Sequence, residues 1–262
     1  MLSREDQYAL FIDIDDTLTV ENYVIPEKNI EALGAARALG HKVFINTGRS
    51  GGNIPPVIFE QLQVDGVISG NGTVVTVDGK TVYSCFFTRE QFEQIASWFF
   101  AHPDFWAVFE GIKRSYTIPG RGRKPSPIEV TAESFEELME KTADDSFQVV
   151  AFCAGVDSSF FELLQESATV FRFRKYFDAV RKGHNKALAM DRAVEVLGIK
   201  PENTIAIGDS ENDLNMIKKA GTGVAVANAM PAVLEAADFV TASNREAGVA
   251  QAVEKLLLRG EL

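Results

Sequence analysis

Three carboxylates stand within four positions at the end of an apolar run. In YALFIDIDDTLTV, residues 8–20, they are Asp13, Asp15 and Asp16, and Thr17 follows directly. Carboxylates this close repel one another, so they stay ionised only if a cation or hydrogen-bond donors compensate their charge; otherwise one takes up a proton. A hard cation such as Mg²⁺ prefers oxygen ligands and needs few carboxylates from a protein. The stretch therefore indicates a metal or proton-transfer site, although Asp-x-Asp also arises by chance in acidic chains.

A second acidic loop lies towards the other end of the chain. In TIAIGDSENDLNMI, residues 204–217, an apolar run leads to Gly208 and a cluster of polar residues just before a predicted helix. One such residue is enough to cap a helix. The loop instead supplies Asp209, Glu211, Asn212 and Asp213. A cation explains this excess better than capping does.

Other residues offer groups that can bind an anion. VFINTGRS, residues 43–50, places Thr47 and Gly48 directly after a predicted strand, where a hydroxyl and backbone N–H groups can hold phosphate oxygens. The alternative is an ordinary turn between strand and helix. Lys186 lies near the start of a predicted helix, where the helix dipole disfavours a positive charge. We expect either an anionic group beside it or a side chain that points to solvent.

Alternating strands and helices predict the parallel sheet that positions these loops. Over the first seventy residues the pattern predicts three strands and two helices, at residues 8–14, 26–40, 41–48, 53–62 and 65–72. The alternation returns near residue 184 and continues to a C-terminal helix. Because ligands bind at the carboxyl ends of parallel strands, Asp13, Thr47 and Asp209 are expected at one edge of the sheet.

The middle of the chain follows a different pattern. TVVTVDGKTVYSCFF, residues 73–87, predicts a hairpin around Asp78 and Gly79, because these residues tolerate the positive φ of such turns. The helices and strands that follow are typical of an α+β unit on an antiparallel sheet. The predicted fold class is α/β, with a Rossmann-like core domain formed by residues 1–82 and 183–262 and an α+β cap domain inserted at 83–182.

Composition limits the partners that this chain can have. The 262 residues are 46% hydrophobic and 24% charged, as in ordinary globular proteins, with a formal net charge of -11. This charge opposes binding to nucleic acid or to anionic lipid surfaces. The sequence shows neither a signal-like segment nor a run of eighteen apolar residues, so we expect a cytoplasmic protein. The negative charge favours a small ligand or a metal cation as its partner. We further expect a monomer or a homodimer.

Taken together, the motifs resemble the haloacid dehalogenase (HAD) superfamily of phosphatases. DIDDT follows the first strand, NTGR the second, one lysine precedes a long helix, and GDSEND follows a late strand. The segments ISGNGTVV, KGHNKALAM and GDSENDLNMIKKAGTGVAVANA are most similar to the Cof-type subgroup, whose members carry a large C2-type cap. The resemblance implies a Mg²⁺-dependent phosphatase of small phosphorylated metabolites, such as sugar phosphates, with a cap that closes over the site and determines specificity.

The resemblance also implies roles for individual residues. Asp13 is the nucleophile that forms an aspartyl-phosphate, and Asp15 is the general acid and later the general base. The residues that bind the substrate phosphate are Thr47, Gly48, Lys186 and Asn212. The Mg²⁺ ligands are Asp13, the backbone carbonyl of Asp15, and Asp209. The residues that orient ligands and waters are Thr17, Asp213 and Asn212.

Three other functions stay open within this fold. They are a phosphomutase, a substrate-restricted sugar-phosphate phosphatase, and a ligand-sensing protein without turnover. The full set of acidic and basic motif residues argues against the last of these. The chain departs from the family at Asp16, where glycine is usual, and we expect a structural or supporting role for this residue.

Overall fold

A computed structural model describes residues 6–173 and 175–258 and divides them into two compact units. The core unit contains the described residues of 1–48, 55–83 and 185–262. The inserted unit contains residues 49–54 and 84–184, apart from residue 174. Each unit has its own sheet, and each is considered separately below.

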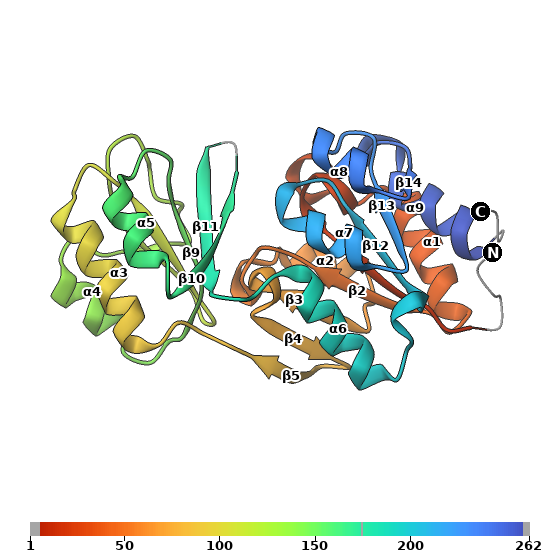
Figure 1. The fold of residues 1–262 in the computed structure, drawn as a ribbon, viewed down its shortest axis with the longest axis horizontal. Coiled ribbons are helices and arrows are strands. Elements are labelled where there is room, and N and C mark those ends of the chain that lie inside the picture. Colours follow the sequence, from red (N-terminus) through yellow and green to blue (C-terminus); the bar gives the residue numbers. More distant parts are fainter. Residues whose placement is uncertain (1–5, 174, 259–262) are drawn as a thin grey trace. The chain divides into compact units, whose positions relative to one another are not determined.

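The core unit is built on an eight-stranded sheet with the order β14-β13-β12-β1-β2-β3-β4-β5 (Figure 1). The strands from β14 to β3 pair in parallel, and β4 joins β3 in the antiparallel sense. The strand bounds are β1 Ala9–Ile12, β2 Lys42–Asn46, β3 Gly66–Ser69, β4 Val74–Val77, β5 Lys80–Ser84, β12 Thr204–Gly208, β13 Thr222–Ala225 and β14 Phe239–Val240. The predicted hairpin therefore forms, with Asp78 and Gly79 between β4 and β5.

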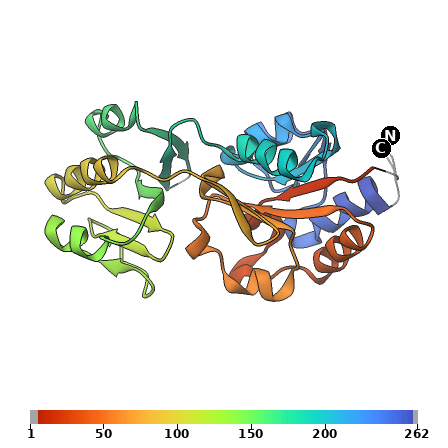
Figure 2. The same ribbon diagram turned by 90° about the horizontal axis from the view of Figure 1, so that it is seen from below.

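Helices cover both faces of this sheet, as parallel sheets require. Figure 2 shows α6 and α7 on one face and α1 and α9 on the other. The helix bounds are α1 Glu27–Ala38, α2 Pro56–Gln61, α6 Lys186–Leu197, α7 Leu214–Lys219, α8 Pro231–Ala236 and α9 Gly248–Val253. All four residues of β1 are fully buried, because both faces of this central strand are covered. The predicted α/β class with a parallel-sheet core is confirmed.

The inserted unit is built on a six-stranded sheet with the order β10-β11-β9-β6-β7-β8, antiparallel except for the pair β7 and β8. The helices α3, α4 and α5 lie against one face of it (Figure 1). The bounds are α3 Arg89–Ala101, β6 Ala107–Gly111, β7 Ser115–Ile118, β8 Val130–Thr131, α4 Phe135–Lys141, β9 Phe147–Cys153, α5 Ser158–Leu164, β10 Ala168–Arg172 and β11 Tyr176–Arg181. Aromatic residues dominate its core, and Phe92 stacks on Phe147 with ring centroids 4.2 Å apart.

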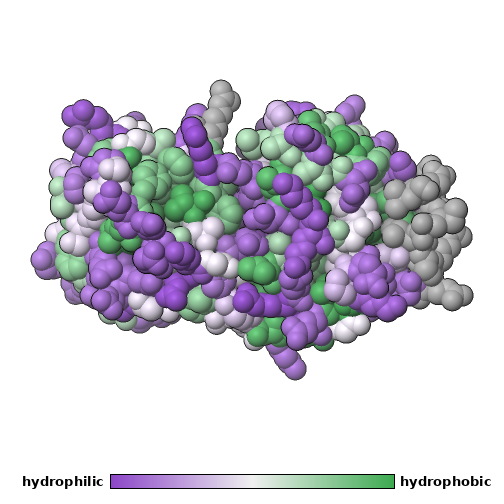
Figure 3. All heavy atoms as spheres, viewed as in Figure 1, coloured by the Kyte–Doolittle hydropathy of each residue, from purple (hydrophilic) through white to green (hydrophobic). Residues whose placement is uncertain are grey.

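The surface of the inserted unit also carries aromatic side chains. Figure 3 shows a hydrophobic patch between α5 and β11 on an otherwise largely hydrophilic face. Phe161 of α5 is 38% exposed and contacts Phe177 of β11 edge to face. Over the described ranges, no helix has the length and apolar character needed to cross a membrane.

Two differences from the sequence prediction concern the loops near the predicted site. The strand predicted at 65–72 ends at Ser69, because Gly70, Asn71 and Gly72 all have positive φ and cannot continue an extended strand. Residues 49–54 lie in the inserted unit and not in the core. There the N–H of Ser50 donates to a carboxylate oxygen of Glu110 at 3.1 Å, and the N–H of Gly51 donates to the side-chain amide oxygen of Gln148 at 2.9 Å.

Candidate active site

The predicted site residues follow strands that are neighbours in the core sheet. The order β12-β1-β2 and a register that aligns Ile12 with Ile207 bring the ends of these strands together. Asp13, Thr47 and Asp209 each come directly after one of them. The Asp13 N–H extends the pairing by donating to the carbonyl of Ile207 at 3.1 Å. The three loops therefore meet at the carboxyl edge, where open parallel sheets bind ligands.

Lys186 is the first residue of α6 and is fully buried. Its Nζ lies 2.6 Å from Oδ1 of Asp13 and 2.5 Å from Oδ1 of Asp213. Burial alone lowers the pKa of a lysine, but these two carboxylates outweigh it and hold the pKa of Lys186 above its ordinary value. The two carboxylates thus account for a cation at a helix N-terminus, which the helix dipole otherwise disfavours.

Three buried carboxylates surround this single ammonium group. Oxygen atoms of Asp13, Asp209 and Asp213 lie within 4.8 Å of one another. Burial raises the pKa of Asp13 to about 7 against the opposing charge of Lys186, and burial together with Asp213 raises the pKa of Asp209 to about 8. A divalent cation fits this donor set, because it prefers oxygen ligands and its charge would keep both acids ionised.

Asp213 also holds the loop that carries Asp209. Its Oδ2 accepts hydrogen bonds from the N–H groups of Asp209 and Ser210, both at 3.0 Å. Gly208 makes room for this carboxylate, since a Cβ at position 208 would lie 2.5 Å from Cγ of Asp213. The hydroxyl of Thr17 donates to Oδ1 of Asp209 at 2.7 Å. The structure therefore places Thr17 and Asp213 against the predicted metal ligand Asp209.

Two of the residues predicted to bind phosphate, Gly48 and Asn212, lie side by side in the core unit. Thr47 is 1% exposed. Gly48 lies beside Asn212, because a Cβ at position 48 would be 3.1 Å from Nδ2 of Asn212. The hydroxyl of Ser210 donates to Oδ1 of Asn212 at 2.7 Å and so fixes which side of its amide faces Gly48.

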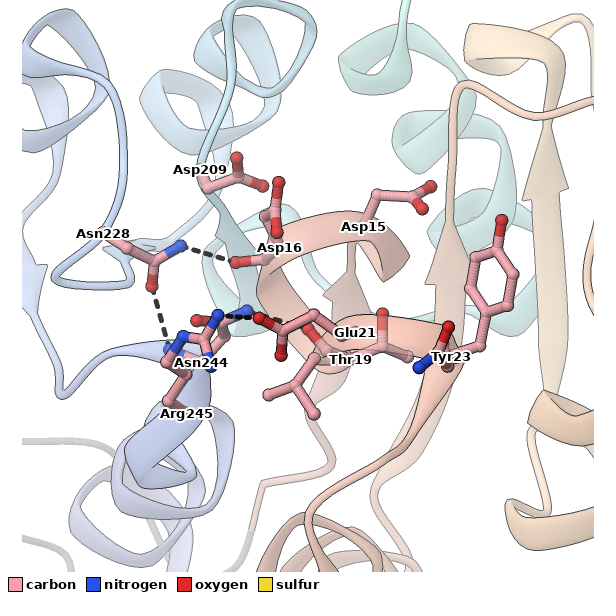
Figure 4. A pocket seen from close by; sticks show the side chains of 11 residues that line it. Asp15, Asp16, Thr19, Glu21, Tyr23, Asp209, Asn228, Asn244 and Arg245 are labelled. Atoms are coloured by element: carbon pink, nitrogen blue, oxygen red, sulfur yellow. Dashed lines mark hydrogen bonds and ion pairs between the residues drawn. The ribbon is translucent and has the colours of Figure 1, made fainter.

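A pocket of about 510 Å³ lies beside the acidic cluster, and Asp15, Asp16 and Asp209 line part of it (Figure 4). Asp15 is half-buried, whereas Asp16 is exposed. Asp16 has a φ of +58°, a left-handed conformation that glycine adopts without strain and that aspartate tolerates better than most residues. The backbone at this position is thus one that glycine and aspartate can both adopt.

Two asparagines with no role in the sequence prediction hold the Asp16 loop. Nδ2 of Asn228 donates to the carbonyl of Asp16 at 2.8 Å, and Oδ1 of Asn228 accepts from the N–H of Asn244 at 2.9 Å (Figure 4). Nδ2 of Asn244 in turn donates to the carbonyl of Thr19 at 2.9 Å. Asparagines in loops are most often turn formers, so neither residue stood out in the sequence.

A sequence model of the haloacid dehalogenase-like hydrolases matches residues 10–253. The chain belongs to this family. The resemblance found in the motifs is thus confirmed over nearly the whole length, together with the parallel-sheet core that the family shares with solved structures.

Curated and solved relatives of this hydrolase support the same assignment. YkrA of Bacillus subtilis is 30% identical over 258 residues, covering 96% of this chain and 98% of that protein. The B. subtilis 5-amino-6-(5-phospho-D-ribitylamino)uracil phosphatase YcsE is 27% identical, covering 98% and 99%. The structure of BT4131, described as a HAD subclass IIB sugar phosphatase, has a TM-score of 0.80 and 28% identity, covering 95% and 99%. This hydrolase is therefore a phosphatase that acts on phosphorylated substrates.

Proposed function

We propose that this phosphatase hydrolyses small phosphorylated metabolites, such as sugar phosphates and related phosphomonoesters, with Mg²⁺ and through an aspartyl-phosphate. The observation that carries the proposal is the buried ion pair between Asp13 and Lys186, 2.6 Å long, in contact with a second acidic loop at Asp209 and Asp213. A nucleophilic carboxylate, a fixed cation and oxygen ligands for a metal are thus collected at one sheet edge.

In the first step a carboxylate oxygen of Asp13 attacks phosphorus. The new O–P bond forms as the bond to the leaving alcohol oxygen breaks, which gives an aspartyl-phosphate and the alcohol. Lys186 holds Asp13 in its charged form and offers positive charge to the phosphoryl oxygens. Since burial raises the pKa of Asp13 to about 7, a bound cation also helps to keep this nucleophile ionised near neutral pH.

Asp15 is proposed to move the protons in both steps. It first donates a proton to the leaving alcohol oxygen. It then accepts a proton from the water that attacks the phosphoryl group, which releases inorganic phosphate and regenerates the Asp13 carboxylate. Its half-buried side chain follows Asp13 by two positions and lines a pocket large enough for water and a small ligand.

The remaining residues are proposed to bind the phosphoryl group and the metal. Mg²⁺, when bound, supplies positive charge that lets an anionic nucleophile approach an anionic substrate. The residues proposed to hold it are Asp13, the carbonyl of Asp15, and Asp209. Those proposed to bind phosphoryl oxygens are Thr47, Gly48, Lys186 and Asn212. Thr17 and Asp213 keep Asp209 in place through the contacts described above.

The substrate class is supported by the names of two relatives. One acts on a uracil that carries a phosphorylated ribityl chain, and the other is a sugar phosphatase. Both substrates have a phosphomonoester on a chain or ring rich in hydroxyl groups. We therefore propose a polyhydroxylated phosphomonoester as the substrate of this chain.

Replacement of the nucleophile tests the mechanism. Asp13→Asn changes the shape little but removes the attacking carboxylate, so phosphate release from a panel of phosphomonoesters with Mg²⁺ should be abolished. Asp16→Asn is the matched control, since it makes the same change three positions away at an exposed site, and it should stay active. An Asp13→Asn protein that keeps a tenth of the wild-type activity would rule out the covalent mechanism.

Product analysis separates a phosphatase from a phosphomutase of the same fold. A labelled sugar phosphate should yield free phosphate and the sugar. Conversion to an isomeric sugar phosphate would show that the phosphoryl group is returned to an intermediate, and would replace this proposal.

A further inference from the structure

A turn of three left-handed residues joins β3 to β4 at the edge of the proposed site. Gly70, Asn71 and Gly72 have φ values of +58°, +51° and +93°. Glycine adopts this region readily, and asparagine is one of the few residues with a Cβ that tolerate it. The central residue is an asparagine, and its side chain is fully buried. A fully buried polar side chain between two glycines points to a role for that side chain.

Asn71 connects the two loops that are proposed to bind phosphate. Its N–H donates to the carbonyl of Thr47 at 3.1 Å, and its Oδ1 accepts a hydrogen bond from Nδ2 of Asn212 at 2.8 Å. Its amide also lies against the backbone of Gly48, because a Cβ at position 48 would be 3.3 Å from both Oδ1 and Nδ2 of Asn71. One side chain thus sets the separation of Gly48 from Asn212.

The same turn contacts the helix that carries Lys186. A Cβ at Gly72 would lie 2.3 Å from the carbonyl oxygen of Asn185. Asn185 is the N-cap of α6, and its Oδ1 accepts from the N–H of Leu188 at 3.0 Å. The turn therefore touches all three elements that are proposed to bind phosphoryl oxygens.

The side-chain amide of Asn71 is only partly hydrogen-bonded. Among the residues that the structure describes, its buried Nδ2 has no hydrogen-bond partner. A buried donor left unpaired is unfavourable, and such a group is often retained where function requires it.

We infer that Asn71 is a positioning residue for phosphate binding: its side chain fixes the amide of Asn212 beside Gly48. The inference rests on the proposed function, because it assumes that these groups bind the phosphoryl oxygens. It predicts that Asn71 acts through Asn212, so losing both side chains costs no more than losing Asn212 alone.

A double-mutant cycle with Asn71→Gly and Asn212→Ala tests this inference. Glycine suits the left-handed backbone at position 71, so the fold should be preserved, and the lost hydrogen bond should lower the unfolding midpoint by only a few degrees. With Mg²⁺ and p-nitrophenyl phosphate, kcat/KM of Asn71→Gly should fall by about tenfold, the effect of one lost positioning hydrogen bond. The double variant should match Asn212→Ala.

Asp78→Gly is the matched control. Asp78 lies in the β4–β5 hairpin with a φ of +47° and is exposed, so the variant places glycine at another left-handed position away from the site. Its kcat/KM should equal that of the wild type. An Asn71→Gly protein with more than half of the wild-type kcat/KM, or a double variant whose loss is the product of the two single losses, would overturn the inference.

Binding of inorganic phosphate separates this inference from the proposed function. A wild-type protein that hydrolyses no phosphomonoester contradicts the proposed function. Calorimetric titration with inorganic phosphate and Mg²⁺ tests Asn71 in either case. Asn71→Gly should bind phosphate about tenfold more weakly than the wild type. Equal affinity of the two proteins, or no binding by either, would contradict the positioning role.

Discussion

Without bound Mg²⁺, the protein is expected to be less stable at pH 8 than at pH 5. Burial raises the pKa of Asp13 to about 7 and, with the Asp213 charge, that of Asp209 to about 8. A carboxyl group whose pKa is higher in the folded state stabilises the fold fully below its unfolded pKa, and this contribution is lost as the pH rises through the folded pKa. The contribution of these two carboxyls to the free energy of unfolding of the metal-free protein should therefore fall as the pH rises from 3.8 to about 8.

The size of this effect follows from the pKa of Asp13. An increase from 3.8 to about 7 corresponds to about 4 kcal/mol, of which about 3 kcal/mol is lost between pH 5 and pH 8. Asp209 adds to this loss, but not in full, because protonation of one carboxyl lowers the pKa of its neighbour. For a chain of this size, about 3 kcal/mol lowers the unfolding midpoint by roughly 6–12 °C.

Thermal unfolding from pH 5 to pH 8, in EDTA and in Mg²⁺, measures the effect. Mg²⁺ should raise the midpoint more at pH 8, where its binding no longer has to displace protons from the carboxyls. His41 acts in the opposite direction, because burial lowers its pKa and its neutral form stabilises the fold as the pH rises. Asp209→Asn separates the two, since it should weaken the dependence on pH and leave His41 unchanged.

Two outcomes would refute this reasoning. One is a metal-free protein that becomes steadily more stable from pH 5 to pH 8. The other is a Mg²⁺ effect of equal size at both pH values, which would mean that the cation does not bind at the titrating carboxyls.

Two further substitutions probe the same cluster. Lys186→Met leaves Asp13 and Asp213 without their buried partner, so chemical denaturation at pH 8 should show a loss of about 3–5 kcal/mol and phosphate release should cease; a loss below about 1 kcal/mol would contradict a buried ion pair. Gly208→Ala places a Cβ 2.5 Å from Cγ of Asp213, so kcat should fall by up to about a hundredfold as this carboxylate is displaced. Wild-type kcat in Gly208→Ala would show that the loop adjusts without cost.

The sequence predicted the strands next to the site because their signals are local. The apolar runs before Asp13, Thr47 and Asp209 correspond to the strands β1, β2 and β12. Parallel pairing of these strands then brings the loops that follow them to one edge of the sheet. From the residue pattern alone, Lys186 was expected either to lie beside an anionic group or to point to solvent. That it contacts Asp13 and Asp213 at once depends on pairing between strands almost two hundred residues apart, which a local pattern does not contain.

What the sequence did not predict depends on backbone conformation and on single long-range contacts. Asp16 and Asn71 have positive φ, which a residue with a Cβ does not signal. The third strand was therefore predicted to continue through residue 72. Asn228 and Asn244 act through single hydrogen bonds to backbone carbonyls, and such bonds leave no periodicity or charge pattern.

The pairing of β1 with β12 has a consequence for synthesis on the ribosome. β1 pairs with β2 soon after both leave the exit tunnel, but its other edge pairs only with β12, whose last residue is Gly208. Two hundred residues separate Asp13 from Asp213, and translation of a segment of this length takes about 10–40 s. During that time the central strand of the future core exposes an unpaired edge, the kind of surface that recruits other strands. The emerging chain therefore has a long interval in which chaperone binding matters, and its active site assembles only after residues 204–213 have been made.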